Sequence, residues 1–215
     1  MADRRSPQSE RRLLIATHNP GKRRELAALL ADLPLQPVDL QALGIDQVAE
    51  EAYESLEENA RAKAAFYAAR SGLWTLADDS GLEIDALGGA PGVHSARFAG
   101  PEADDADRIR EVLRRMAGVP WPQRTARFRC VMALARPGEP PVLVEGRLEG
   151  YIALEPRGEH GFGYDPIFYI PELGKTLAEL PLEAKNQISH RARAAQKARA
   201  ILKRWLQELP LDPEG

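Results

Sequence analysis

Short apolar runs alternate along the chain with segments in which apolar residues recur every three or four positions. The first run, Leu13–Thr17, predicts a buried strand, which the polar residues His18–Gly21 bring to an end. Asn19 can cap the helix that follows, and Pro20 suits the first turn of that helix. The leucines beyond it keep helical spacing. The chain is therefore expected to begin with a strand, a tight turn and a helix.

A second helix is predicted to begin at Ser55 and to run to about Arg70. Ser55 and Glu58 have the spacing of a capping box, in which two side chains satisfy each other's backbone N–H groups. One face of this helix is lined by small residues four positions apart, which allows close packing. These residues are Ala60, Ala64 and Ala68.

Two short strands separated by acidic residues are predicted next. Trp74–Ala77 is expected to be a strand that ends at Asp78–Gly81, and the alternation in Leu82–Ala86 indicates another strand. A helix follows, and its apolar residues keep helical spacing. These residues are Ile109, Val112, Leu113 and Met116.

A hairpin of two longer strands is predicted in the second half of the chain. Thr125–Ala135 and Val142–Leu148 flank a turn rich in proline and glycine, and Tyr151–Leu154 can extend the same sheet. Arg157–Pro166 is a glycine-rich loop, and the last helix is expected to start near Ser189. The alternation of strands and helices predicts an α/β fold.

The composition is that of a globular protein with nearly balanced charge. The chain has 215 residues, 44% of them apolar, and a formal net charge of −3. That length suits one large domain or two lobes that share a core. The small net charge gives no general attraction to nucleic acid or to an anionic membrane, so any polyanion site must be local. No apolar run approaches the roughly 20 residues of a membrane helix, and we expect neither a nucleic-acid nor a membrane partner.

The single cysteine and the arginine-rich start bear on location and domain limits. Cys130 excludes an intrachain disulfide, and its alternating apolar neighbours predict a buried structural thiol. This usage fits a reducing, cytoplasmic location. Residues 1–12 hold four arginines without an apolar signal core, so they are interpreted as a disordered tail. A basic targeting or nucleic-acid arm is the alternative. Residues 13–207 are expected to form one two-lobed domain, and residues 208–215 a second tail.

The turn from Thr17 to Lys22 is the first candidate for chemistry. A strand, a tight polar turn and a helix start aim backbone N–H groups and the positive end of the helix at one point, which favours an anion. Lys22 adds a full positive charge. The turn is not a Walker A loop, because Ala16 stands where that motif has glycine. An ordinary capped helix start is the alternative interpretation.

The adjacent acids Asp78 and Asp79 are the second candidate. Successive strand residues point to opposite sides, so one carboxylate is expected to face a cleft and the other to be held structurally. Carboxylate oxygens suit Mg²⁺, which typically takes one or two of them and completes its shell with water and phosphate. An acidic surface turn is the alternative, and the apolar flanks Leu76 and Leu82 argue against it.

Glu50 and Glu51, together with Asn59 and Lys63, form the third candidate. Asn59 and Lys63 are four residues apart, so they lie on one face of the second helix. A solvated surface lysine is the alternative for Lys63.

Two polar segments late in the chain could contact a nucleobase. Glycines in Gly158–Pro166 let the backbone approach a ligand closely, and Phe162 and Tyr164 offer flat faces for stacking. Asp165 offers a fixed acceptor, although a loop whose aromatic residues fill the core is the alternative. The polar cluster Lys185–Arg191 can bind an anion or a base edge, or it can simply cap the last helix.

Taken in order, these signals resemble the inosine triphosphate pyrophosphatase family, also called the non-standard purine NTP pyrophosphatases. The resemblance implies an elongated α/β fold, with a central mixed sheet and two lobes around a deep cleft, and a homodimer. The implied reaction is the Mg²⁺-dependent hydrolysis of ITP, dITP and XTP to the monophosphate and pyrophosphate, which removes deaminated purines from the nucleotide pool. The motifs that carry the resemblance, between about Leu13 and Leu202, are Thr17-x-Asn19-x-x-Lys22, Glu58-Asn59-Ala60 with Lys63, Ala77–Leu82, Gly88–Gly92, Ser95–Arg97, Phe162–Pro166 and Ser189–Arg191.

The resemblance also implies a role for each candidate residue. Asp79 would be the catalytic base and a metal-site residue, and a second metal-site acid falls at Glu50 or Glu51, with the choice left open. The turn and Lys63 would hold phosphate, Ser80 would touch the substrate, and the later residues would grip the base and sugar. The implied substrate-binding residues are Thr17, His18, Asn19, Pro20, Gly21, Lys22, Lys63, Ser80, Phe162, Gly163, Tyr164, Asp165, Lys185, His190 and Arg191. The arginine-rich start precedes the match and should be dispensable.

Two other functions stay open from the sequence. A Maf-like pyrophosphatase would act on other modified nucleotides, and faster turnover of dTTP or UTP than of ITP would identify it. A non-catalytic nucleotide- or RNA-binding module would explain the aromatic and cationic residues without a role for Asp79. Release of pyrophosphate from ITP would exclude that module.

Overall fold

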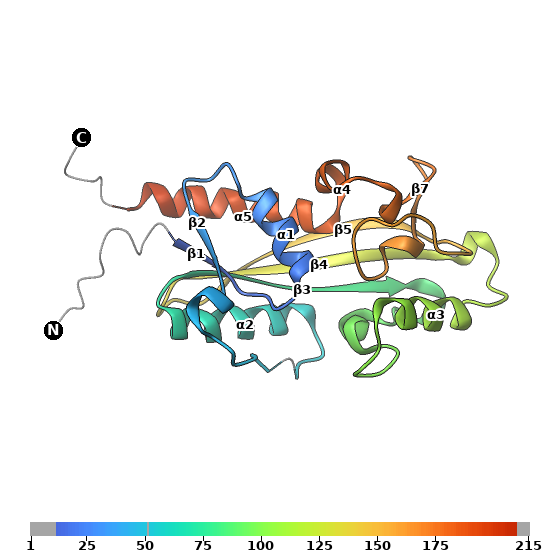
Figure 1. Ribbon diagram of the computed structural model, residues 1–215, viewed down its shortest axis with the longest axis horizontal. Coiled ribbons are helices and arrows are strands. Elements are labelled where there is room, and N and C mark those ends of the chain that lie inside the picture. Colours follow the sequence, from blue (N-terminus) through green and yellow to red (C-terminus); the bar gives the residue numbers. More distant parts are fainter. Residues whose placement is uncertain (1–11, 51, 210–215) are drawn as a thin grey trace. The chain divides into compact units, whose positions relative to one another are not determined.

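The computed structural model describes residues 12–50 and 52–209, over which seven strands form one sheet in the order β2-β1-β3-β4-β5-β6-β7 (Figure 1). The strands are β1 Arg12–Ile15, β2 Gln36–Asp39, β3 Trp74–Ile84, β4 Thr125–Ala135, β5 Val142–Ile152, β6 Phe168–Ile170 and β7 Lys175–Thr176. The helices are α1 Pro20–Leu29, α2 Leu56–Ser71, α3 Asp105–Arg115, α4 Leu182–Ile188 and α5 His190–Gln207. Parallel pairs in the first strands and antiparallel pairs in the last make the sheet mixed. The predicted α/β fold with a central mixed sheet and flanking helices is confirmed, and the cleft stays a prediction.

The chain divides into two compact units, whose four boundaries fall inside β3, β4, β5 and the helix α5. Unit 1 comprises the residues up to 79, residues 131–145 and those from 194 onward. Unit 2 comprises residues 80–130 and 146–193. Asp79 and Ser80, although adjacent in the chain, therefore belong to different units.

In unit 1, the order in which successive strands are added to the sheet reverses at β1. β1 pairs in parallel with β2 on one side and with β3 on the other. Because crossover connections are right-handed, helices that lead to opposite sides of a strand cover opposite faces of the sheet. Figure 1 shows α1 and α2 on opposite faces. In open α/β sheets ligands bind where the strand order reverses, at the carboxyl ends of the strands, and β1 ends there at Ile15.

Local sequence signals set the first residues of α1 and α2. The Asn19 side chain caps α1 by accepting a hydrogen bond from the Lys22 N–H at 3.0 Å, and Pro20 is the first helical residue. Ser55 caps α2 by accepting from the Glu58 N–H. The predicted capping box is only half formed, because the Glu58 carboxylate accepts from the Ser55 hydroxyl. The alanine face of α2 is buried as predicted, at Ala60, Ala64 and Ala68.

The prediction of two strands around the acidic residues is wrong, because β3 runs without a break through Asp78 and Asp79. These side chains belong to residues that are only 1% and 7% exposed. A buried carboxylate is tolerated in a strand only when charged or hydrogen-bonding partners offset its lost hydration. Such partners come from α1 and α2, which sequence periodicity within β3 cannot reveal. Gly81 lets β3 continue beside another segment, because a Cβ there would lie 2.2 Å from the Gly92 carbonyl oxygen.

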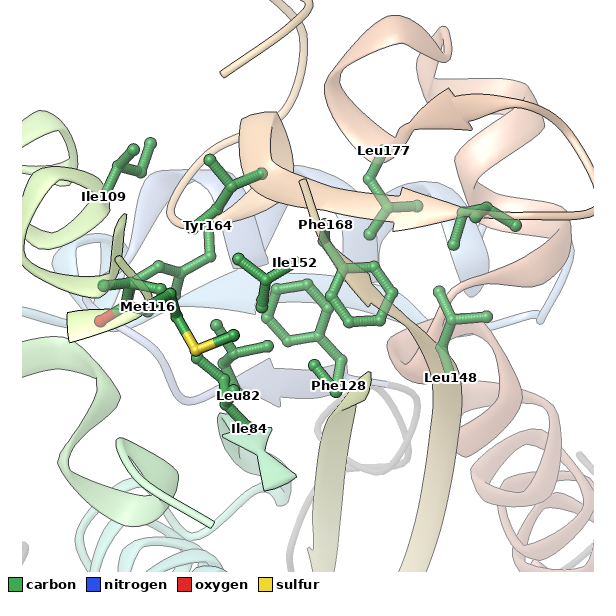
Figure 2. Packing of buried hydrophobic residues seen from close by; sticks show 14 of the residues in the cluster. Leu82, Ile84, Ile109, Met116, Phe128, Leu148, Ile152, Tyr164, Phe168 and Leu177 are labelled. Carbon is green, nitrogen blue, oxygen red and sulfur yellow. The ribbon is translucent and has the colours of Figure 1, made fainter. Parts of the chain in front are cut away.

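A cluster of buried apolar side chains forms the core of unit 2 (Figure 2). The predicted apolar face of α3 packs into it through Ile109, Val112 and Met116, while Leu113 is partly buried against it. Phe128 and Phe168 also belong to the cluster, and their ring centroids lie 4.5 Å apart. The long apolar alternation of β4 therefore predicted core residues correctly.

Arg124 is buried at the edge of this core, with only 3% of its surface exposed. Its guanidinium donates to the carbonyl oxygens of Ile152 at 2.7 Å, Met116 at 2.9 Å and Ala153 at 2.9 Å. Burial lowers the pKa of this guanidinium. Arg124 therefore connects Met116, the residue after α3, to the end of β5 by hydrogen bonds. All of these acceptors are backbone carbonyl oxygens.

Several sequence predictions differ from the structure at chain ends and sheet edges. β5 extends to Ile152, and neither α4 nor the short strands β2, β6 and β7 were predicted. β1 begins at Arg12, which the pattern assigned to the tail, and Glu208 of the predicted second tail pairs with Arg136. Residues 1–11, Glu51 and residues 210–215 lie outside the described part of the chain.

Two further predictions from the sequence concern the burial of Cys130 and the absence of a membrane-spanning helix. Cys130 is a fully buried thiol, as predicted. Within the described residues, no helix is both long enough and apolar enough to span a bilayer.

Candidate active site

The turn after β1 brings Lys22 against the first acid of β3. Ile15 lies opposite Leu76 in the parallel pairing, so the residues that follow these two continue side by side. The turn is ordered by its own polar groups, because the Thr17 hydroxyl accepts from the Asn19 N–H at 3.1 Å. Lys22 Nζ lies 3.1 Å from Asp78 Oδ2, and the Asp78 side chain is fully buried. The predicted anion turn and the acidic pair are therefore neighbours within unit 1.

Asp79 is held from α2, on the other side of β3. Asn59 Nδ2 donates to Asp79 Oδ2 at 3.0 Å, and Lys63 Nζ lies 3.7 Å from Asp79 Oδ1. Asn59 and Lys63 share one face of α2, as their spacing predicts. Asp78 and Asp79 point to opposite sides of the strand, toward α1 and α2 respectively. The Asp79 side chain keeps 10% of its surface exposed, so it can reach solvent or a ligand.

Glu50 is exposed, in a segment that the α2 side chain Tyr67 holds by hydrogen bonds. The Tyr67 hydroxyl accepts from the Ala49 N–H at 3.1 Å and donates to the Gln47 carbonyl at 3.2 Å. His18 Nε2 of the turn after β1 lies 3.2 Å from the same hydroxyl. Tyr67 therefore joins the predicted phosphate turn to the segment that carries Glu50.

In unit 2, two cations flank the ring of Phe162. Lys185 Nζ lies 4.9 Å from the ring centroid, and the Arg191 guanidinium carbon lies 5.5 Å from it. Lys185 forms a buried ion pair with Asp165, and the Arg191 guanidinium donates to the Ser80 hydroxyl at 3.0 Å. Phe162 itself is half-buried, so part of its ring can meet a flat ligand.

His190 and Tyr164 are fixed by the core of unit 2. The His190 ring stacks on Phe128 at 4.6 Å between centroids, with 14° between the planes. Tyr164 is only 5% exposed and belongs to the apolar cluster, where Figure 2 shows its ring beside Met116. Its hydroxyl donates to the Ser95 carbonyl at 2.8 Å. Of the two interpretations of this loop, the buried ring of Tyr164 agrees with the one in which its aromatic residues fill the core.

The predicted residues thus fall into two sets, one in each unit. Unit 1 holds the phosphate turn, Lys63, Glu50 and Asp79, and unit 2 holds Ser80, assigned to substrate contact, with the residues assigned to base and sugar. The unit 2 set is Ser80, Phe162, Gly163, Tyr164, Asp165, Lys185, His190 and Arg191. Glu51 lies outside the described residues.

Comparison with known proteins identifies the family to which these residues belong. A family model described as the Ham1 family matches residues 13–201. The chain belongs to the Ham1 family. A relative from Geobacillus kaustophilus, named dITP/XTP pyrophosphatase, is 52% identical over 185 residues, which cover 86% of this chain and 91% of the relative. A Bacillus subtilis protein of the same name is 50% identical over 189 residues, covering 88% of this chain and 96% of that protein.

Solved structures of Ham1 proteins have the same fold. A HAM1 protein from Coxiella burnetii superposes with a TM-score of 0.81 at 42% identity, covering 90% of this chain and 98% of its own. A nucleoside-triphosphatase, also named dITP/XTP pyrophosphatase, from Mycobacterium abscessus has a TM-score of 0.70 at 40% identity, covering 89% of this chain and 98% of its own. The family resemblance that the motifs indicated is confirmed.

The acids of this Ham1 chain suit a hard divalent cation that is shared with phosphate. Over the described residues, no three side chains among His, Cys, Asp and Glu converge as a complete metal cage. Mg²⁺ does not need such a cage, because it typically takes one or two carboxylates and fills the rest of its shell with water and phosphate oxygens. Asp79, with its partly exposed carboxylate, and the exposed Glu50 fit that requirement.

Sequence reasoning missed Tyr67 as a residue of the site. Asn59, Lys63 and Tyr67 are spaced by four residues on α2, so they lie on one helix face. Asn59 and Lys63 contact Asp79, and Tyr67 contacts His18 of the turn after β1. That spacing was the available signal, but a tyrosine among alanines is more readily interpreted as core.

Proposed function

We propose that this chain hydrolyses dITP, ITP and XTP to the corresponding monophosphate and pyrophosphate, which removes deaminated purines from the nucleotide pool. Two kinds of observation support the proposal. Relatives about 50% identical over most of their length bear the name dITP/XTP pyrophosphatase. The turn ending in Lys22, the pair Asp78–Asp79 and Lys63 converge at the carboxyl end of β1, where ligands of open α/β sheets bind.

Asp79 is the proposed base of the reaction. Its carboxylate accepts from Asn59 and lies beside Lys63, so its position is fixed while part of it stays exposed. It would orient a water toward the α-phosphorus and accept its proton as the bond to pyrophosphate breaks. A carboxylate kept ionised by a cation is a weak base, so orientation carries much of its contribution.

Lys22 and Lys63 are the proposed phosphate cations. Each is already placed beside an aspartate, which fixes the end of a long side chain before the substrate arrives. The backbone N–H groups at the start of α1 add further anion donors. Asp79, together with Glu50 or Glu51, would hold Mg²⁺. The bound ion would offset negative charge on the triphosphate and on the departing pyrophosphate.

The unit 2 residues are proposed to recognise the base. Hypoxanthine and xanthine carry a carbonyl where adenine carries an amino group. N–H donors placed at that position would bond to the carbonyl of hypoxanthine or xanthine. The same donors would stay unpaired opposite the amino group of adenine, and such a mismatch can change the ratio of kcat/KM between two substrates by roughly 10⁴. His190, Arg191 and the backbone of the Phe162–Asp165 loop are candidate donors, and the half-exposed ring of Phe162 is a candidate stacking face.

A pyrophosphate-release assay over all common and deaminated nucleoside triphosphates, with and without Mg²⁺, tests the proposal. We expect the fastest turnover with dITP, ITP or XTP and none without a divalent metal. Faster turnover of dTTP or UTP would favour a Maf-like activity, and no release from any nucleotide would favour a binding module. The homodimer and the cytoplasmic location stay predictions of the sequence.

Asp79→Asn tests the assignment of the base. Turnover of dITP should fall by about 10³-fold, because the amide cannot accept the proton. Binding of dITP, measured by calorimetry on the inactive variant, should remain. Asp46→Asn, which changes an exposed acid of unit 1, serves as the matched control. Wild-type turnover in Asp79→Asn would remove Asp79 from the mechanism.

A further inference from the structure

The loop Gly161–Asp165 depends on contacts from elsewhere for its conformation. Gly161 and Gly163 have φ angles of 75° and 63°, in the left-handed region that favours glycine. A Cβ on Gly161 would lie 2.0 Å from Asp165 Oδ2, so that glycine also makes room for the buried carboxylate. Because glycine has the most backbone freedom to lose on folding, such a loop keeps one shape only when other segments hold it.

Asp105, the first residue of α3, holds the centre of this loop. Its Oδ2 accepts a hydrogen bond from the Gly163 N–H at 2.6 Å, across 58 positions of sequence. Asp105 also pairs with Arg108. Arg108 in turn donates to the carbonyl oxygens of Ala96 and Ala103 at 2.9 Å and 2.6 Å. A hydrogen bond from a backbone N–H to a carboxylate is about twice as strong as one between neutral groups.

The next residue of the loop is held separately. The buried Tyr164 hydroxyl donates to the Ser95 carbonyl, and burial raises the pKa of Tyr164 above its usual value. The Ser95 side chain accepts from the Leu82 N–H at 2.9 Å and donates to the Gly92 carbonyl at 2.6 Å. Ser95 therefore links the loop to the strand segment that follows Ser80.

Asp105 is not needed to cap its own helix. The capping box of α3 is formed by Asp104 and Asp107, each of which accepts from the backbone N–H of the other. The carboxylate of Asp105 instead accepts from the Gly163 N–H and pairs with Arg108. Loss of Asp105 and loss of Asp107 should therefore have different consequences, although both residues lie in the first turn of α3.

We propose that Asp105 is a positioning residue for base selection, which holds the Phe162–Asp165 loop in the shape that recognises a purine. The inference rests on the proposed function, because it assigns the loop to the base. Asp105 acts through the Gly163 N–H and does not touch the substrate. Its loss lets Phe162 and the Asp165 carboxylate shift relative to each other, while the phosphate residues of unit 1 are unaffected.

The kinetic test compares Asp105→Ala, Asp105→Asn and the control Asp107→Ala. Asp105→Ala should raise the KM for dITP about tenfold, lower the preference for dITP over dATP by a similar factor, and leave kcat within about twofold. Asp105→Asn should restore most of the KM, because its amide oxygen can still accept from Gly163. Asp107→Ala should leave both values as in the wild type. The inhibition constant of pyrophosphate should not change in any variant.

Hydrogen exchange of the 158–168 peptide tests the anchoring without using activity. Exchange should be faster in Asp105→Ala than in Asp107→Ala, and nearly wild-type in Asp105→Asn. Equal KM values and equal exchange rates in the two alanine variants would overturn the proposal. A wild-type protein that releases no pyrophosphate from dITP would overturn the proposed function and the selection role with it, while the exchange rates would still decide whether Asp105 holds the loop.

Discussion

Replacing Lys22 and replacing Asp78 should change the free energy of unfolding by different amounts, although the two residues form one ion pair. The Asp78 side chain is fully buried, whereas Lys22 keeps 16% of its side-chain surface exposed. Lys22→Met removes the cation that lies 3.1 Å from the buried Asp78 carboxylate. Asp78→Asn leaves a lysine that can turn toward water. The first change should therefore be the more destabilising.

The magnitudes follow from the burial of the two partners. Removing one member of a buried pair costs about 3–5 kcal/mol, and for Lys22→Met we expect about 3 kcal/mol because Asp78 has further interactions. Asp78→Asn should cost about 1.5 kcal/mol, since water replaces part of the lost pairing. The double variant leaves no buried charge behind and should cost about 2.5 kcal/mol. The coupling between the two positions is then about 2 kcal/mol.

Urea unfolding of the four proteins, followed by tryptophan fluorescence, measures this cycle. Trp74 and Trp205 form an edge-to-face pair in unit 1, with 5.3 Å between ring centroids, so their emission reports on the unit that holds the ion pair. Single variants whose costs add within about 0.5 kcal/mol would refute the reasoning. So would Asp78→Asn being the more destabilising of the two. Either result would mean that the buried carboxylate depends on other partners.

Two further predictions concern the framework of unit 2. Gly81→Ala should destabilise the protein strongly and reduce dITP turnover, because the new Cβ would meet the Gly92 carbonyl oxygen at 2.2 Å and β3 would have to move; melting temperature and pyrophosphate release measure this, and an unchanged protein would contradict it. Arg124→Met should cost about 2–4 kcal/mol, because buried carbonyl oxygens such as those of Ile152 and Met116 lose their donors. Urea unfolding measures that cost, and a loss below about 1 kcal/mol would show that water takes over these carbonyl groups.

Elements whose signals are local could be predicted from the sequence. Asn19 and Pro20 define the start of α1 through their own side-chain chemistry, and both are found in those positions. The bounds of β4 agree with the predicted Thr125–Ala135, because long apolar alternation is specific to a strand. By contrast, β2, β6 and β7 have two to four residues each. They are strands because neighbouring strands pair with them, which their own residues do not indicate.

The wrong and the open predictions at the site both concern contacts between distant segments. Asp78 and Asp79 are typical of a turn by residue type, yet they lie inside a strand because lysines from two helices meet them there. For Tyr164 the sequence left two interpretations open, a stacking face or a core residue, and the contact that favours the second is the hydrogen bond from its hydroxyl to the Ser95 carbonyl. In each case the partner is more than ten residues away, so no local pattern contains it.

The ion pairs also bear on how a chain with negative net charge could bind the polyanionic substrate proposed above. The three lysines among the predicted substrate-binding residues each lie beside an aspartate: Lys22 with Asp78, Lys63 with Asp79 and Lys185 with Asp165. Each such pair adds nothing to the net charge of −3, so composition cannot register it. Within each unit, a cation without a carboxylate partner would be repelled by neighbouring cations, whereas a cation paired with an aspartate stays in place. If the proposed function holds, affinity for phosphate comes from the geometry of backbone donors and positioned lysines, and not from an excess of positive charge.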